Sequence, residues 1–137
     1  MERMNGYYKN QHSCYLLQYH LVLVVKYRHK IIDGEIKKFL EKYTEEYFKK
    51  QNCRLIEINT DKDHIHILFE GCPNMNLSTL VNAYKSASSR HIRKIYQEKI
   101  NQYLWKDAFW SRSYYIGTVS EKNTEIVKEY IRNQGIK

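Results

Sequence analysis

Residues that break or cross-link a chain are scarce in this sequence. Its 137 residues include one proline, five glycines and three cysteines. The cysteines, Cys14, Cys53 and Cys72, are odd in number, and none lies in a C-x-x-C pair. This pattern argues against a disulfide framework and against a structural zinc site. We expect free, buried thiols instead.

Long apolar runs are also missing. No stretch approaches the roughly 18 apolar residues of a membrane-spanning helix. The first ten residues are polar and tyrosine-rich, unlike a signal segment. We therefore expect a soluble, cytoplasmic protein that has no membrane partner. Because no linker, internal repeat or low-complexity segment interrupts it, the chain is predicted to form one domain over residues 1–137.

Acidic residues are outnumbered by basic ones. Asp and Glu total 15 against 23 Lys and Arg, which gives a formal net charge of +8. On so small a domain this balance favours a polyanionic partner, although solubility alone would explain the charge as well. The 13 tyrosines matter more, because their flat amphipathic rings can stack on nucleic-acid bases.

Two histidines alternate with apolar residues in one short run. His64 and His66 flank Ile65, and Ile67 and Phe69 continue the alternation, which predicts a half-buried strand. The two imidazoles then share one face, roughly 7 Å apart along the strand. The apolar residues share the other face and can pack on a core. Such a histidine pair can bind a metal, although pairs at this spacing are common without one.

The order of the predicted elements indicates the fold. They are a strand over residues 15–28, a helix over 34–50, strands over 53–59 and 64–70, a helix that starts near 76–78, a strand over 112–119 and a helix over 125–133. Residues 1–13 are expected to be a loose polar lead-in, and 97–111 an irregular connection. The first six elements match the α+β, ferredoxin-like (RRM-like) βαββαβ sandwich, whose four-stranded antiparallel sheet carries two helices on one face. The histidine pair would then face the open side.

The helix that starts near residues 76–78 has a predicted buried stripe and a basic side. The stripe consists of Leu77, Leu80, Val81, Tyr84, Ala87, Ile92 and Ile95. Lys85, Ser88, Arg90 and Arg93 lie away from most of it. Cations beside small hydroxyls suit contacts with DNA phosphates, but a plain solvated face is an equally good interpretation.

The last helix carries Tyr130 and Gln134, which are four residues apart and therefore lie on one helix face. If that face covers the open side of the sheet, His64, His66 and Gln134 form a neutral ligand set for Mg²⁺ or Mn²⁺. Such a site fits phosphoryl transfer in which the Tyr130 phenolate attacks phosphorus and leaves a covalent phosphotyrosine. The alternative is that Tyr130 is an ordinary core residue.

Four stretches, taken together and in this order, resemble the single-tyrosine HUH transposases of single-stranded insertion sequences and their relatives, the REP-associated tyrosine transposases. Residues 19–28 (YHLVLVVKYR) are similar to the family's opening strand, and residues 63–66 (DHIH) to its His-hydrophobic-His signature. Residues 85–90 (KSASSR) are similar to its Lys-Gly-x-Ser-Ser-Arg segment, and residues 127–134 (VKEYIRNQ) to its closing tyrosine helix.

The resemblance implies a homodimer that recognises DNA hairpins at the ends of a mobile element. It implies cleavage and rejoining of single-stranded DNA through 5′-phosphotyrosine intermediates, with Tyr130 as nucleophile and His64, His66 and Gln134 as ligands of Mg²⁺ or Mn²⁺. The tyrosine helix can serve the histidines of the other subunit in this family. Two alternatives stay open: a domesticated palindrome-processing nuclease, and a non-enzymatic RRM-like module that binds RNA or single-stranded DNA.

Overall fold

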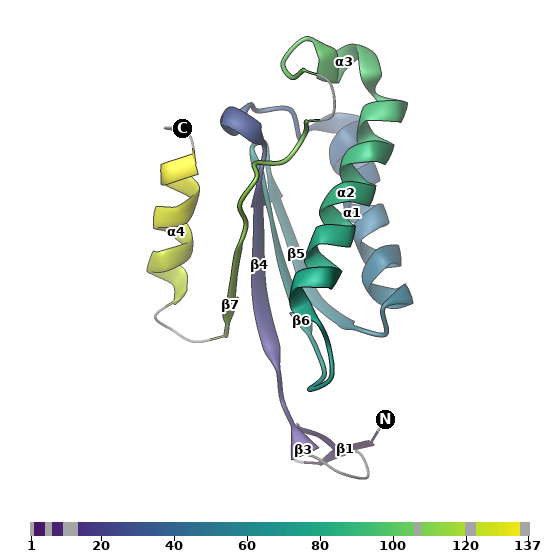
Figure 1. Cartoon of the computed structure of the whole chain (residues 1–137), viewed down its shortest axis with the longest axis vertical. Coiled ribbons are helices and arrows are strands. Elements are labelled where there is room, and N and C mark those ends of the chain that lie inside the picture. Colours follow the sequence, from purple (N-terminus) through teal and green to yellow (C-terminus); the bar gives the residue numbers. More distant parts are fainter. Residues whose placement is uncertain (1, 5–6, 10–13, 106–107, 120–122, 135–137) are drawn as a thin grey trace.

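A four-stranded antiparallel sheet organises the chain, and helices cover both of its faces (Figure 1). The computed structural model describes residues 2–4, 7–9, 14–105, 108–119 and 123–134. The strand order is β5-β6-β4-β7. These strands are β4 (Gln18–Val24), β5 (Arg54–Asp61), β6 (His64–Glu70) and β7 (Tyr115–Thr118). The predicted α+β class and four-stranded antiparallel sheet are confirmed.

The helices form a layer on each side of this sheet. Figure 1 shows α1 (Gly34–Lys50) and α2 (Leu77–Ile95) on one face, and α4 (Asn123–Gln134) alone on the other. The short α3 (Gln97–Asn101) follows α2 inside the connection that we expected to be irregular. The face that the six-element pattern leaves open is thus covered by the tyrosine helix.

Strand periodicity explains the main core. Ile65, Ile67 and Phe69 alternate along β6, are fully buried and point to the α1 and α2 side. Phe48 of α1 and Tyr84 of α2 meet them there, with the Phe48 and Phe69 ring centroids 4.9 Å apart. Each such side chain contributes about 1.5–3 kcal/mol by leaving water.

Strand β4 is buried on both faces, as its near-continuous apolar character predicts. Leu21 and Leu23 belong to the main core. Val22 and Val24 point the other way and are also fully buried. Their cover consists of Tyr115, Tyr130 and Ile131. The central strand therefore connects the structural core to the layer that contains the tyrosine helix.

The loose lead-in expected over residues 1–13 is wrong at residues 2–4 and 7–9, which form strands, and the rest of that range lies outside the described residues. β1 (Glu2–Met4), β2 (Tyr7–Lys9) and β3 (Cys14–Tyr15) pair into a separate three-stranded antiparallel sheet. Strands of two or three residues are too short to produce a recognisable alternation, which explains why the sequence pattern missed them.

The first long strand is also shorter than predicted, because β4 ends at Val24. A single 3-10 turn, η1 (Lys26–Arg28), follows. Tyr27 and Arg28 have φ angles of 59° and 54° in that turn. Two successive left-handed residues cannot continue a strand, so the chain leaves the sheet here.

Helix starts follow the local signals in part. The Asn76 side chain accepts a hydrogen bond from the Thr79 amide at 3.0 Å, so α2 begins where its cap predicts. Asp33 precedes α1 but forms no side-chain cap bond, and its carboxylate pairs instead with Lys99. Within the described residues, no helix has the length and apolar character needed to cross a membrane.

The predicted free thiols are confirmed at the two positions where the side chain is described. Cys53 is free and buried, whereas Cys72 is free but partly exposed. The side chain of Cys14 lies outside the described residues.

Candidate active site and metal centre

The histidine pair lies on the sheet face that α4 covers. Strand register places His64 opposite Val24 and His66 opposite Val22 on β4. Cross-strand partners share a face, and both valines pack beneath Tyr130. The two imidazoles and the phenol therefore occupy the same side of the sheet, as the alternation along β6 predicts.

Ser113, just before β7, links the two predicted functional residues of α4. Its Oγ lies 3.0 Å from Tyr130 Oη and donates to Gln134 Oε1 at 3.3 Å. One turn of helix separates Tyr130 from Gln134, so both side chains reach the same hydroxyl. Sequence reasoning missed Ser113, because nothing in its local pattern distinguishes it from neighbouring loop serines.

The phenol of Tyr130 is protonated at neutral pH. Burial raises its pKa above the ordinary value, and the hydrogen bond with Ser113 offsets only part of that rise. The Tyr115 ring contributes to this environment, with its centroid 6.0 Å from that of Tyr130. A nucleophilic role for this oxygen therefore requires that its proton leave during attack.

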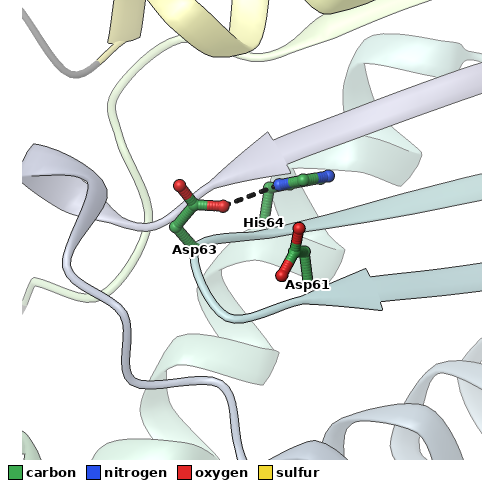
Figure 2. A group of neighbouring side chains, drawn as sticks. All are labelled: Asp61, Asp63 and His64. Carbon is green, nitrogen blue, oxygen red and sulfur yellow. Dashed lines mark hydrogen bonds and ion pairs between the residues drawn. The ribbon is translucent and has the colours of Figure 1, made fainter.

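Asp63 orients His64 at the start of β6. Figure 2 shows the bond between them, which joins His64 Nδ1 to Asp63 Oδ1 at 2.8 Å. A carboxylate at Nδ1 favours the tautomer with the proton on that nitrogen and leaves Nε2 free to bind a metal. Burial raises the pKa of Asp63, but hydrogen bonds from His64 and Arg28 outweigh it, and the net pKa is lowered.

Arg28 connects this pair to the tyrosine helix. Its Nε donates to Asp63 Oδ2 at 3.1 Å, and its Nη1 donates to the Arg132 carbonyl at 3.4 Å. Left-handed backbone at Tyr27 and Arg28 costs about 1–2 kcal/mol per residue. The strained turn thus places one guanidinium between the β5–β6 hairpin and α4.

His66 has a histidine partner of its own. His20 Nδ1 lies 2.7 Å from His66 Nε2, and the two rings stack with centroids 4.9 Å apart. Burial lowers the pKa of both imidazoles, and each is neutral at pH 7. His20 is half-buried on β4, and His66 is its partner. A ligand role for His66 requires that Nε2–H donate to His20, which leaves the Nδ1 lone pair.

Two carboxylates surround His64 and make a possible metal site. Donor atoms of Asp61, Asp63 and His64 all lie within 4.8 Å of one another (Figure 2). Asp61 ends β5 and pairs with His64 in the strand register. Carboxylate oxygens and neutral imidazole suit Mn²⁺, and carboxylates suit Mg²⁺, so these residues fit such an ion. The predicted strand over 53–59 ends before Asp61, so sequence reasoning gave this carboxylate no role, although its place three residues before His64 was the available signal.

Gln134, the third predicted ligand, has no described contact with Asp61, Asp63 or His64. Its side-chain oxygen accepts a hydrogen bond from Ser113, on the α4 side. A hollow of about 380 Å³ opens beside Gln134, lined also by Lys26, Tyr27 and Arg112. The structure thus gathers His64 and His66 on one strand and Tyr130 and Gln134 on the helix above it.

The predicted DNA contacts on α2 divide into three accessible cations and one buried serine. Arg90 is exposed, Arg93 donates to Ser89 at 3.1 Å, and Lys85 Nζ donates to the Arg112 carbonyl at 2.7 Å. Burial lowers the pKa of Lys85.

The prediction that Ser88 lies away from the buried stripe of α2, beside the cations, is wrong. Ser88 is fully buried, and its Oγ accepts a hydrogen bond from Trp110 Nε1 at 2.9 Å. It lies four residues from both Tyr84 and Ile92, which puts it on the buried stripe of the helix. Conversely, Ile95, expected in that stripe, is 53% exposed.

Comparison with known proteins adds to this geometry. Residues 13–134 match the family described as "Transposase IS200 like". The chain belongs to the IS200-like transposase family. The matched range contains the sheet, all four helices and every predicted site residue. Membership in this family places the chain among enzymes of DNA transposition, which bind DNA, and decides against a non-enzymatic RRM-like module.

Individual relatives agree with the family assignment. The IS200-like chain is 32% identical over 126 residues to the ISDra2 transposase TnpA of Deinococcus radiodurans, covering 92% of this chain and 89% of that one. It is 31% identical over 123 residues to the transposase for insertion sequence element IS200 of Salmonella typhimurium, covering 90% and 80%.

A solved structure supports the same fold for this IS200-like transposase. The crystal structure of a candidate transposase from Deinococcus radiodurans R1 aligns with a TM-score of 0.85 at 28% identity. The alignment covers 93% of this chain and 97% of that one. A REP-associated tyrosine transposase bound to a REP hairpin is much more distant, with a TM-score of 0.47 at 13% identity over 90% and 70% of the two chains.

Proposed function

We propose that this IS200-like transposase cleaves and rejoins single-stranded DNA at the ends of a mobile element, with Tyr130 as the nucleophile. The observation that carries this proposal is the arrangement around Ser113. A half-buried phenol and a carboxamide share one hydroxyl, on the sheet face that presents His64 and His66. A core tyrosine also needs a partner for its hydroxyl, as Tyr84 has in Thr44 at 2.6 Å, but Tyr130 differs in that two histidines lie on the same face of the sheet.

The proposed reaction exchanges one phosphate ester for another. Tyr130 Oη forms a bond to the phosphorus of a DNA phosphodiester, and the bond from phosphorus to the 3′ oxygen breaks. The phenol loses its proton, and the departing 3′ oxygen gains one. The product is a 5′-phosphotyrosine, which a later attack by a 3′-hydroxyl reverses, so strands are rejoined without an external energy source.

Each neighbour of Tyr130 has a proposed part in this step. Ser113 holds the phenol by hydrogen bonding and partly opposes the rise of its pKa. His64, His66 and Gln134 are the proposed metal ligands, and Asp61 is a further donor within reach of His64. A bound Mg²⁺ or Mn²⁺ would stabilise negative charge on the phosphate that is attacked. Asp63 fixes the orientation of the His64 ring.

The proposed partners are DNA hairpins near the element ends and a second copy of this chain. The hairpin proposal is supported by the family assignment and by the cations Lys85, Arg90 and Arg93 along α2. The homodimer proposal follows from the family resemblance of the tyrosine helix. Sedimentation of the purified protein tests it directly, and a monomer at all concentrations, with and without DNA, would refute it.

The nucleophile is tested by adduct formation. The protein is incubated with a single-stranded oligonucleotide that carries an end hairpin, with Mn²⁺ present, and the products are separated under denaturing conditions. We expect a covalent protein–DNA adduct that Tyr130→Phe abolishes without loss of DNA binding. Tyr115→Phe is the matched control, because its ring lies beside that of Tyr130. An adduct that persists in Tyr130→Phe assigns the chemistry to another tyrosine.

The histidines are tested in the same assay. His64→Ala and His66→Ala should each prevent adduct formation at every Mn²⁺ concentration that supports the wild type. His91→Ala is the control, because His91 is an exposed histidine on α2. Normal cleavage by both site variants would overturn the metal-site assignment while leaving Tyr130 as the nucleophile.

A further inference from the structure

An exposed tryptophan stands beside a cluster of cations at the carboxyl end of α2. Trp105 is 83% exposed, the highest value among the large hydrophobic residues of the described chain. A hollow of about 600 Å³ lies against it. Arg90, Arg93 and Lys94 line this hollow together with Gln97. The described lining contains no acidic side chain.

The surrounding backbone holds Trp105 in place. Leu104, the preceding residue, is buried, and its amide donates to the Ile100 carbonyl at 2.9 Å. The Trp105 carbonyl accepts from the Ala108 amide at 3.3 Å. Phe109 is buried as well. A large apolar ring is therefore presented to solvent directly after a buried residue, by a residue whose own carbonyl is hydrogen-bonded.

The charge of this hollow distinguishes it from another on the same molecule. A larger hollow, of about 750 Å³, lies between α1 and β5, and its lining has more acidic than basic side chains: Glu41, Glu45 and Glu57 against Lys49 and Arg54. Those carboxylates would repel a polyanion. Beside Trp105 a flat indole adjoins three cations, which is the combination that binds single-stranded nucleic acid: the ring stacks on a base while the cations contact phosphates.

The cationic surface continues towards the active site. A second hollow, of about 370 Å³, shares Arg90 and Arg93 with the first and extends to Lys85. Lys85 contacts the Arg112 carbonyl, and the next residue, Ser113, contacts Tyr130. These contacts connect α2 with α4. They run past β7, which is an edge strand of the sheet.

We propose that the Trp105 hollow binds an unpaired nucleotide of the DNA substrate, with the indole stacked on its base and Arg90, Arg93 and Lys94 at its phosphates. The inference rests on the proposed single-stranded DNA activity and adds a second contact region, on the opposite layer from Tyr130. A base-paired segment cannot use the indole in this way, because its bases are already stacked on one another.

Equilibrium binding of a fluorescent oligo(dT) to the full chain, with chelator present, tests the stacking. Trp105→Ala should weaken binding about 5- to 150-fold, the range for loss of one base–aromatic stack. Trp105→Phe should retain most of the affinity. Tyr103→Ala is the matched control, since Tyr103 is an exposed aromatic of the same connection outside the hollow. Unchanged affinity in Trp105→Ala overturns the proposal.

Tryptophan fluorescence gives an independent readout, because Trp105 and the buried Trp110 are the two tryptophans of the chain. Oligo(dT) should quench the emission of the wild type but leave that of Trp105→Phe nearly unchanged. Equal quenching in wild type and Trp105→Phe contradicts the inference.

The salt dependence of binding tests the cations. Lys94→Ala should reduce the slope of log binding constant against log salt concentration by about 0.7, whereas Lys38→Ala, on exposed α1 surface, should not change it.

Two further experiments distinguish an unpaired nucleotide from duplex DNA and from a second copy of the chain as the partner of this surface. A fully paired duplex should bind Trp105→Ala and the wild type with similar affinity, and an equal loss on duplex and oligo(dT) would refute an unpaired nucleotide. A change in sedimentation of Trp105→Ala without a change in DNA affinity would assign the surface to a second copy of the chain. Adduct formation by Tyr130 is measured separately, so failure of the proposed function is distinguishable from failure here.

Discussion

Arg28 offers the sharpest test of how the site is held together. Its guanidinium pairs with Asp63, whose side chain is 8% exposed, and also reaches the Arg132 carbonyl on α4. The perturbation is Arg28→Met, which removes the charge and the donors but keeps an unbranched apolar stem. Methionine is as strained as arginine at a φ of 54°, so the cost of the left-handed backbone cancels in the comparison.

The magnitude follows from the exposure of the pair. A hydrogen bond to a charged group contributes about 1.5–3 kcal/mol. Because the Arg28 side chain is 35% exposed, solvent screens part of this interaction. We therefore expect Arg28→Met to lower the free energy of unfolding by about 1–2 kcal/mol at pH 7.

The pH dependence has a defined sign. Burial raises the pKa of Asp63, but hydrogen bonds from His64 and Arg28 lower it below its ordinary value. A carboxylate with a lowered native pKa stabilises the fold above its unfolded-state pKa, about 3.9, and this contribution is lost as the pH falls through the native value. The difference between wild type and Arg28→Met should be complete at pH 7 and shrink below about pH 4.

Urea unfolding at several pH values, followed by circular dichroism, measures this difference. Lys38→Met is the control, since Lys38 pairs with Glu35 at 4.0 Å while both side chains are 78% exposed. Equal unfolding midpoints for Arg28→Met and the wild type at pH 7 would refute the role assigned to Arg28. A difference that stays constant down to pH 2 would show that Asp63 is not the group involved.

Three further outcomes are expected. Ser113→Ala should slow adduct formation about 2- to 12-fold, by loss of one hydrogen bond, and move the pH at which Tyr130 becomes reactive upwards, seen in a pH series of adduct rates. Asp61→Asn should weaken Mn²⁺ binding in calorimetry, and unchanged affinity would remove that carboxylate from the metal site. Burial raises the pKa of Cys53 to about 11, so iodoacetamide at pH 8 should label Cys72 well before it, as read by peptide mapping.

Local sequence patterns were sufficient for predictions that depend on a single strand or helix. The alternation around His64 and His66 predicts both the strand and the face on which they lie, because side chains on a strand must alternate. The start of α2 is signalled by Asn76, whose side chain accepts a bond from the Thr79 amide. The four-residue spacing likewise predicts that Tyr130 and Gln134 lie on one face of α4.

Local patterns failed where a residue's role depends on a distant partner. Ser88 is a small polar residue of the kind expected on a surface. Its hydroxyl is nevertheless buried, because it accepts a hydrogen bond from Trp110, 22 residues later. His20 and His66 meet only because β4 and β6 are neighbours in the sheet. Tyr27 and Arg28 form a left-handed turn although neither is a glycine, so the sequence does not indicate this turn.

The sequence by itself determined the family resemblance and the sheet topology, and it marked His64, His66, Tyr130 and Gln134 as candidate site residues, because periodicity and motif order are properties of neighbouring residues. Tertiary structure alone decided which groups meet. It brought Ser113 to Tyr130, Asp61 to His64 and Arg28 between two layers. These contacts depend on strand register and on the docking of α4, which are fixed by packing across the whole domain.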